Sequence, residues 1–360
     1  MPRFGSLQEL LRDRSRSDEL GTVITQLVHV SDQEPGIRRQ RRGRAFTYVG
    51  PDGERLGDEA VLARIRGLAI PPAWTDVWIS PEANGHIQAT GRDQKGRKQY
   101  RYHSLWTTCR DEVKYGNMLP FAGTLPKLRR TVEADLGRRG LELPKVCASV
   151  VWLLDNTLIR VGNSAYAREN RSFGLTTLRD RHVEVEGARL RFDFRGKSGK
   201  HWRLALTDRR IARIVRSVQD LPGQHLFQYL DEDGSRRPLT SQEVNGYIQE
   251  AAGDNFSSKD FRTWAGTVRA LELFSRTELP ESKTAQARTA NAVIDEIASR
   301  LGNTRAVCRR CYIHPQVMLS WSGGTLAQEL AETKPRGGRR ELDASEAHAR
   351  AWLALHEAVH

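Results

Sequence analysis

Tyr312 stands downstream of three basic residues in suggestive local settings: Arg160 in LIRVGN, Lys197 in FRGKSGK and Arg262 in KDFRTWAGT. Asn303 precedes the tyrosine by nine positions. One use of a tyrosine calls for two arginines and a lysine around it: attack on a phosphodiester, which leaves the DNA end covalently bound to the phenol oxygen. These residues therefore predict a transesterification site.

Each residue type suits one requirement of that reaction. Attack adds about one negative charge around the phosphorus, and the rigid, permanently charged fork of arginine fits the non-bridging oxygens. The leaving 5′-hydroxyl needs a proton, and a positioned general acid such as Lys197 is worth about 10²–10⁴ in rate. Nearby positive charge favours deprotonation of Tyr312. Because one ester is exchanged for another, the reverse step needs no ATP.

The elements that must position these residues are predicted from hydrophobic periodicity. From residue 45 to about residue 102, short alternating runs meet turn signals, a pattern typical of a small antiparallel sheet. One helix at roughly 58–67 interrupts it. The residues before this sheet form a polar opening that ends in the basic run 38–44.

Beyond the sheet, apolar residues recur at helical spacing. Alternation over 182–206 predicts strands, with a turn that carries Lys197. A last apolar stripe over 287–301 predicts a helix that stops at Gly302, immediately before Asn303. The candidate residues therefore fall at the ends of elements, where side chains from different segments can converge.

We therefore expect an α+β protein with a small β-rich N-terminal domain and a larger, mainly α catalytic domain that contains a β-hairpin sheet. The expected divisions are an N-terminal extension at 1–36, the β-rich domain at 37–108, the catalytic domain at 109–322, and a C-terminal linker and helix at 323–360.

Composition narrows the class of protein. The chain of 360 residues carries 57 Lys and Arg against 44 Asp and Glu, a formal charge of +13 that attracts polyanions. No stretch approaches the ~18 apolar residues of a membrane span, and the N-terminus lacks the apolar core of a secretory signal. Four cysteines do not make a disulfide framework. We expect a cytoplasmic protein that binds nucleic acid.

A metal or nucleotide cofactor is not expected. Cys308, Cys311 and His314 have a spacing that suggests zinc, but three candidate ligands without a second nearby pair fall short of a zinc site. A metal held by both cysteines would also restrict Tyr312. No glycine-rich segment has the pattern of a phosphate-binding loop.

In order and local context, the candidate residues resemble the active site of type IB DNA topoisomerases, most closely the poxvirus-like and bacterial branch. The first arginine of that family lies in I-R-x-G-x-x-x-Y, matched at 159–166 by a segment that ends in Tyr166. Its lysine follows F-x-G, matched at 194–197, and its second arginine stands in K-D-[LF]-R-T, matched at 259–263. The segment L-G-[HN]-T, matched at 301–304, precedes the nucleophile by nine positions.

This resemblance implies a role for each residue. Tyr312 forms a 3′-phosphotyrosyl link, Arg160, Arg262 and Asn303 stabilise the transition state, and Lys197 protonates the leaving oxygen. The poxvirus enzymes carry His where this chain has Asn, which can donate a hydrogen bond but cannot supply a proton. The implied activity is relaxation of supercoiled DNA without ATP or an obligatory metal.

The resemblance extends to the N-terminal domain. Residues 96–102, GRKQYRY, are similar to the G-R-x-Q-Y-x-Y strand whose tyrosines face DNA in the family. The implied DNA-binding residues are Arg97, Lys98, Gln99, Tyr100, Tyr102 and Tyr166. We expect a monomer that encloses duplex DNA as a C-shaped clamp and is associated with the nucleoid.

Two alternatives remain open. Tyrosine recombinases share the catalytic fold and chemistry, but they usually carry His in H-x-x-R where this chain has Lys259. A non-catalytic DNA-binding protein on the same scaffold is disfavoured, because every expected active-site position holds a competent residue. Loss of DNA cleavage in Tyr312→Phe would exclude the non-catalytic alternative.

Overall fold

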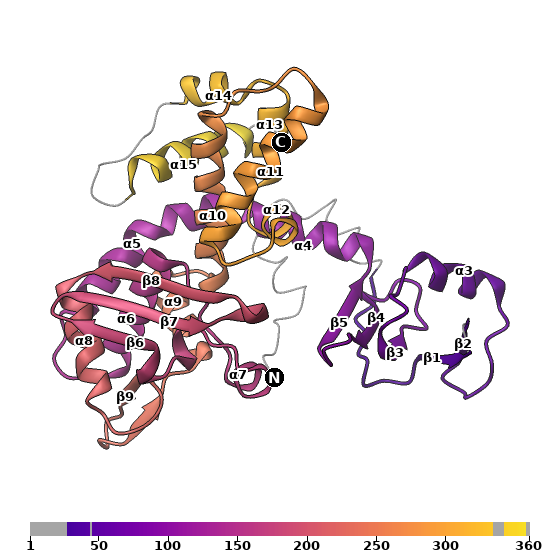
Figure 1. The fold of residues 1–360 in the computed structure, drawn as a ribbon, viewed down its shortest axis with the longest axis horizontal. Coiled ribbons are helices and arrows are strands. Elements are labelled where there is room, and N and C mark those ends of the chain that lie inside the picture. Colours follow the sequence, from indigo (N-terminus) through magenta and orange to yellow (C-terminus); the bar gives the residue numbers. More distant parts are fainter. Residues whose placement is uncertain (1–26, 44, 334–341, 358–360) are drawn as a thin grey trace. The chain divides into compact units, whose positions relative to one another are not determined.

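The structure is a computed structural model that describes residues 27–43, 45–333 and 342–357. The chain divides into two compact units, Met1–Gly116 and Asn117–His360, here called the first and second units. The boundary expected at 108–109 falls inside α4 (Ser104–Gly116), a helix of the first unit (Figure 1). Most of the predicted extension, residues 1–26, lies outside the described residues.

The first unit contains an antiparallel sheet in the order β2-β1-β3-β4-β5. Its strands are β1 (Ile37–Arg42), β2 (Ala45–Val49), β3 (Thr75–Ile79), β4 (Ile87–Arg92) and β5 (Lys98–Tyr102). The basic run predicted to close a polar opening is thus largely a strand. It folds this way because Ile37 is buried while Arg39 donates to the carbonyl oxygen of Trp74 at 2.6 Å.

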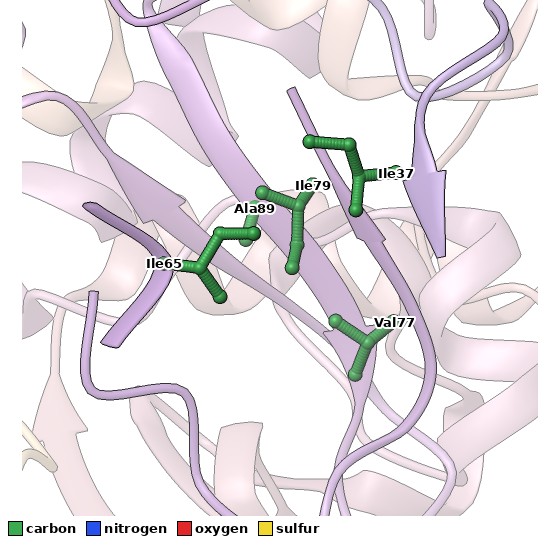
Figure 2. Close-up of a cluster of buried hydrophobic side chains, with 5 residues drawn as sticks. All are labelled: Ile37, Ile65, Val77, Ile79 and Ala89. Atoms are coloured by element: carbon green, nitrogen blue, oxygen red, sulfur yellow. The ribbon is translucent and has the colours of Figure 1, made fainter. Parts of the chain in front are cut away.

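One helix covers the apolar face of this sheet. It is α3 (Glu59–Gly67), which confirms the helix predicted at 58–67, and Asp58 caps it by accepting from the backbone N–H of Ala60 at 2.8 Å. Figure 2 shows the resulting core, formed by Ile37, Ile65, Val77, Ile79 and Ala89. This packing fixes the sheet that carries β5 at its edge.

The second unit is mainly helical and packs around α10 (Ser258–Ser275) (Figure 1). The helices that contact α10 are α5 (Met118–Leu136), α6 (Leu143–Thr157), α9 (Ser241–Ala252), α11 (Lys283–Arg300), α13 (Pro315–Ser322), α14 (Leu326–Glu332) and α15 (Ala344–Glu357). The linker predicted after residue 323 thus contains a helix, α14. The apolar stripe predicted to be helical over 287–301 is confirmed as α11.

A second antiparallel sheet, β6-β7-β8, belongs to this unit. Its strands are β6 (Val183–Glu186), β7 (Arg189–Arg195) and β8 (His201–Thr207), as the alternation over 182–206 predicts. The helix α8 (Arg209–Gln219) packs against β6 and β7 with its buried apolar face. The shorter elements are α7 (Ser164–Asn170), α12 (Arg305–Cys311), β9 (Gln228–Leu230) and β10 (Arg236–Pro238).

The fold is thus mixed, with antiparallel sheets and many helices. Within the described residues, no helix has both the length and the apolar character needed to cross a membrane.

Candidate active site

Arg160 follows the end of α6 on a segment whose backbone is held on both sides. Leu158 adopts a left-handed conformation (φ 59°) that ends the helix. The carbonyl oxygen of Arg160 then accepts from the backbone N–H of Leu175 at 2.9 Å. This approach requires Gly174, because a Cβ there would lie 2.5 Å from the Arg160 oxygen. Gly174 and Leu175 therefore support the backbone of Arg160.

Asn303 contacts Arg160 directly. The guanidinium of Arg160 donates from Nη2 to Oδ1 of Asn303. The asparagine is only 6% exposed, and its Nδ2 donor has no hydrogen-bond partner among the described residues. Gly302, with φ +58°, supplies the left-handed turn between α11 and Asn303. Arg160 thus fixes the carboxamide so that one buried donor is left for a ligand.

Arg262 lies in α10 and is 3% exposed. Its Nη1 donates to the carbonyl oxygen of Leu158, and its Nη2 donates to that of Leu301 at 2.6 Å. Its Nε has no partner among the described residues. One guanidinium therefore joins the end of α6, near Arg160, to the end of α11, near Asn303.

Tyr312 follows α12 and is seated on α10. Its carbonyl oxygen accepts from the hydroxyl of Thr267 at 3.3 Å, and a Cβ at Gly266 would lie 2.4 Å from that same oxygen. The Cζ atom of Arg262 lies 5.2 Å from the centre of the tyrosine ring. Arg262, Gly266 and Thr267 therefore form the α10 surface on which the tyrosine rests.

Lys197 stands at the turn between β7 and β8, next to Gly196. Trp202 packs beneath this turn: a Cβ at Gly196 would lie 2.7 Å from Trp202 Cδ1, and one at Gly302 would lie 2.6 Å from Trp202 Cζ2. A single indole therefore touches both the glycine before Lys197 and the glycine before Asn303. Sequence reasoning missed Trp202, although Gly196 and Gly302 mark the two close approaches.

The charges of four side chains of the site, Arg160, Lys197, Arg262 and Tyr312, influence one another. Burial raises the pKa of Tyr312, but the charges of Arg262 and Arg160 outweigh it, and the pKa falls below its ordinary value of 10. Burial around the ammonium, followed by the charge of Arg160, lowers the pKa of Lys197, although the phenol opposes this. Burial, then the charge of Arg160, lowers the pKa of Arg262, which stays charged at neutral pH.

The site is therefore a positively charged group of side chains, Arg160, Lys197, Arg262 and Asn303, around a phenol whose pKa is lowered; we call this group the recess. Burying a donor without a partner costs about 1–3 kcal/mol, and an anion that accepts from Asn303 Nδ2 and Arg262 Nε recovers that cost. Such a recess can bind a phosphate-like anion and place it beside a nucleophilic oxygen.

The predicted residues of the first unit lie on or next to β5, and strand alternation separates them. Lys98, Tyr100 and Tyr102 share one face, where Lys98 pairs with Asp32 at 2.5 Å. The tyrosine rings stack with centroids 5.8 Å apart and are 43% and 38% exposed. We call these three residues the β5 patch.

Arg97 and Gln99 are held differently from the β5 patch. Both donate to the carboxylate of Asp93, Arg97 from Nε at 2.8 Å and Gln99 from Nε2 at 3.0 Å. Tyr166 lies on α7, whose N-terminus is capped by Asn163. No contact recorded among the described residues joins the Tyr166 side chain to the recess.

Of the two cysteines near Tyr312, Cys308 is buried and Cys311 is partly exposed. Cys308 is fully buried, which raises the pKa of its thiol to about 12. The described residues contain no group of three His, Cys, Asp or Glu side chains placed to hold a metal ion.

Comparison with known proteins gives two family matches. A model described as the catalytic core of eukaryotic DNA topoisomerase I matches residues 101–334. A model described as the N-terminal domain of bacterial DNA topoisomerase IB matches residues 45–93. All the residues of the recess fall within the first match, and α15 lies beyond it.

Individual relatives agree with these models. DNA topoisomerase 1B of Acanthamoeba polyphaga mimivirus is 33% identical over 286 residues, which cover 77% of this chain and 85% of the relative. DNA topoisomerase 1B of Vaccinia virus (strain Copenhagen) is 23% identical over 291 residues, covering 77% and 87%. DNA topoisomerase 1 of Mycosarcoma maydis is 25% identical over 203 residues, covering 50% of this chain and 20% of the relative.

Proposed function

Because this chain belongs to the type IB DNA topoisomerases, we propose that Tyr312 is the nucleophile with which it cleaves and rejoins one strand of duplex DNA. The phenol oxygen, after losing its proton, attacks the phosphorus, and the bond from phosphorus to the 5′-oxygen breaks. The products are a 3′-phosphotyrosyl link and a free 5′-hydroxyl. Attack by that hydroxyl reverses the step after the broken strand has rotated, so supercoils relax.

The observation that supports this assignment is the buried guanidinium of Arg262, whose Cζ lies 5.2 Å from the centre of the Tyr312 ring and whose Nε has no partner among the described residues, together with the buried, unpartnered Nδ2 of Asn303. Arg160, Arg262 and Asn303 bind the non-bridging oxygens of the scissile phosphate and stabilise the charge that develops on them. Their donors are held in place before DNA arrives, so little reorganisation is needed during the reaction.

Lys197 is the general acid in this proposal. Its ammonium protonates the 5′-oxygen as that oxygen leaves, and the lowered pKa makes the proton easier to transfer. The exposed turn that carries Lys197 leaves room for the DNA strand. In religation the same amine takes the proton back.

The remaining residues bind DNA away from the reaction centre. The β5 patch supplies one cation and two aromatic rings, which suit phosphate and groove contacts. Arg97, Gln99 and Tyr166 are assigned to further DNA contacts, as the family resemblance implies. The two units close around the duplex as a C-shaped clamp made by one chain, in the cytoplasm at the nucleoid. Light scattering of the DNA complex should give one chain per duplex.

A supercoiled-plasmid relaxation assay in EDTA, without nucleotide, tests the mechanism. Wild type is expected to relax the plasmid, because no proposed step uses a metal or ATP. Tyr312→Phe, which removes only the phenol oxygen, is expected to be inactive and to form no covalent DNA adduct. Mass spectrometry of the wild-type adduct should place the nucleotide on Tyr312. Relaxation by Tyr312→Phe, or an adduct on another residue, would contradict the assignment.

A further inference from the structure

The helix α15 follows the topoisomerase I core match, which ends at residue 334, and yet it packs against α10 and α5. Its residue Glu346 is 7% exposed, so a carboxylate is buried where the helix meets the rest of the unit. A buried carboxylate is costly unless it is paired and hydrogen-bonded. Its partners therefore indicate what the helix contributes.

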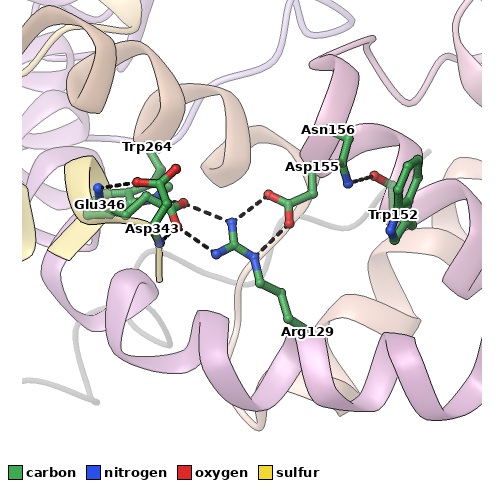
Figure 3. Close-up of polar contacts among 7 residues, drawn as sticks. All are labelled: Arg129, Trp152, Asp155, Asn156, Trp264, Asp343 and Glu346. Atoms are coloured by element: carbon green, nitrogen blue, oxygen red, sulfur yellow. Dashed lines mark hydrogen bonds and ion pairs between the residues drawn. The ribbon is translucent and has the colours of Figure 1, made fainter. Parts of the chain in front are cut away.

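Arg129 of α5 lies between two carboxylates (Figure 3). Its Nη1 and Nη2 donate to the two oxygens of Glu346 at 2.7 and 2.9 Å. Its Nε and Nη2 donate to the two oxygens of Asp155 at 2.8 and 3.0 Å. Both pairs are bidentate, a geometry that fixes orientation as well as distance.

Glu346 also holds α10. The indole Nε1 of Trp264 donates to Glu346 Oε1 at 2.9 Å, and Trp264 is buried. Trp264 stands two residues after Arg262 on the same helix. The position of Glu346 therefore constrains the helix that carries Arg262.

Asp155 connects the same cluster to the other arginine. It lies in the last turn of α6, three residues before Leu158, whose carbonyl oxygen accepts from Arg262. The chain continues from there to Arg160. The cluster of Arg129, Asp155, Trp264 and Glu346, here called the brace, thus links the two segments that carry the arginines of the recess.

The ionisation of the brace residues is consistent with a role in positioning the helices. Burial opposes ionisation of Glu346, but its hydrogen bonds with Arg129 and the charge of that residue outweigh it and lower its pKa. Burial raises the pKa of Asp155, with Arg129 opposing. Replacing a buried ionic cluster by apolar side chains often costs no stability, so the stability of the fold does not by itself require this one. What it supplies is a fixed mutual orientation of four helices, α5, α6, α10 and α15.

We propose that Glu346 is a positioning residue for DNA cleavage, because it sets α10 against the end of α6 so that Arg262 and Arg160 meet the same phosphate. This inference rests on the catalytic roles proposed above. The DNA-cleaving centre then depends on a helix outside the matched family core.

Two tryptophans provide a matched test. Trp264→Phe removes the indole N–H that holds α10 to Glu346. Trp352→Phe removes a hydrogen bond of the same length from another buried indole, from Trp352 Nε1 to the partly buried Glu329 Oε2 at 2.9 Å, which joins α15 to α14 instead. For each variant three quantities are measured: the single-turnover cleavage rate at saturating DNA, the DNA concentration for half-saturation, and the unfolding temperature. Cleavage is followed well below the unfolding temperature.

Trp264→Phe is expected to lower the saturated cleavage rate by about 3- to 30-fold without changing half-saturation, while Trp352→Phe leaves the rate unchanged. The unfolding temperatures should fall by similar amounts. If both variants slow cleavage equally, or neither does, the positioning role is wrong and α15 acts through stability alone.

If a tryptophan variant does not fold, the same comparison is made with two variants that replace the carboxylate partner of each indole by a neutral amide. Glu346→Gln is expected to slow cleavage and Glu329→Gln is not. In Trp264→Phe combined with Glu346→Gln, the two losses should be less than multiplicative, because both changes break one connection. Multiplicative losses would overturn the inference. If wild type itself forms no adduct on Tyr312, the proposed function fails; if wild type cleaves normally and these variants do not differ, only the brace fails.

Discussion

Two groups of cations in this chain are held by opposite kinds of partner. On and beside β5, Lys98 pairs with Asp32 at 2.5 Å and Arg97 pairs with Asp93 at 2.6 Å, so carboxylates balance the positive charges. In the recess of the second unit the recorded partners of the arginines are neutral. Arg262 is held by two backbone carbonyls, and Arg160 is held by an amide oxygen.

The difference separates binding from catalysis. The cations Lys98 and Arg97 stay 43% and 36% exposed in these pairs, so they remain accessible to a DNA phosphate. Ion pairs near the surface are worth about 0–1 kcal/mol, and the β5 patch therefore suits contact that forms and breaks easily. A neutral acceptor fixes an arginine in place without cancelling its charge, so the full positive potential is available to the transition state. The arginines of the recess are thus held directly by neutral oxygens, two of them at helix ends, whereas the acidic residues of the brace contact only the helices that carry the arginines.

The largest effect is expected from a change at Lys197, whose surroundings differ from those of Lys98. Lys98 lies beside a carboxylate, whereas Lys197 lies among arginines and is the proposed acid. Lys197→Ala is expected to slow cleavage by about 10²–10⁴-fold. A substrate with sulfur in place of the leaving 5′-oxygen should recover most of the rate, because a thiolate leaves without a proton. Equal loss on both substrates would exclude an acid role.

The same assignment predicts a pH dependence of the cleavage rate. The rate should rise with pH as Tyr312 ionises, at a pH below the ordinary phenol value of 10. It should fall as Lys197 loses its proton, below the ordinary lysine value of 10.5. Lys197→Ala should lack the descending limb of this profile. A descending limb that persists in the variant would assign it to another group.

A smaller effect is expected when Asn303, the neutral acceptor of Arg160, is replaced by a charged acceptor. Asn303→Asp keeps the shape of the side chain but removes the Nδ2 donor and places a negative charge beside Arg160. We expect cleavage at saturating DNA to fall by about 10²–10³-fold. Asn303→His keeps a donor and should retain more activity than Asn303→Asp. If the aspartate variant cleaves as well as the histidine variant, neutrality of the acceptor is unimportant.

The smallest effect is expected from the opposite change in the first unit. Asp32→Asn keeps an acceptor for the hydroxyl of Thr90 but releases Lys98 from its counter-charge. Binding of duplex DNA, measured in the Tyr312→Phe background, should tighten by up to about 5-fold at low salt. Asp76→Asn, which alters the pair with Arg92 on the same sheet, is the matched control. Equal effects of the two changes would mean that only net charge matters.

The sequence predicts which residues react better than it predicts the contacts that hold those residues in place. The motifs around Arg160, Lys197, Arg262, Asn303 and Tyr312 are local, and so is the periodicity that predicts the helices and strands beside them. The structure brings these five together in one recess. Their roles in catalysis remain proposals.

The supports come from contacts between distant segments. Arg262 binds carbonyls at the ends of two other helices, and no local pattern shows which backbone oxygens a helix end leaves unpaired. The contacts of Trp202 with Gly196 and Gly302 could not be predicted either, because they depend on how the β7–β8 hairpin packs against the end of α11. Strand alternation, by contrast, was available in the sequence, and it separates Arg97 and Gln99 from the β5 patch.

The place of Glu346 in the chain has a consequence for synthesis. A ribosome adds Tyr312 before Glu346, and the 34 intervening steps take about 2–7 s at bacterial to eukaryotic elongation rates. During that interval a nascent chain contains the nucleophile but lacks the carboxylate that holds α10. A chain released early would therefore carry every reacting group and still cut DNA slowly. The proposed role of Glu346 would thus keep DNA cleavage slow until α15 has been synthesised.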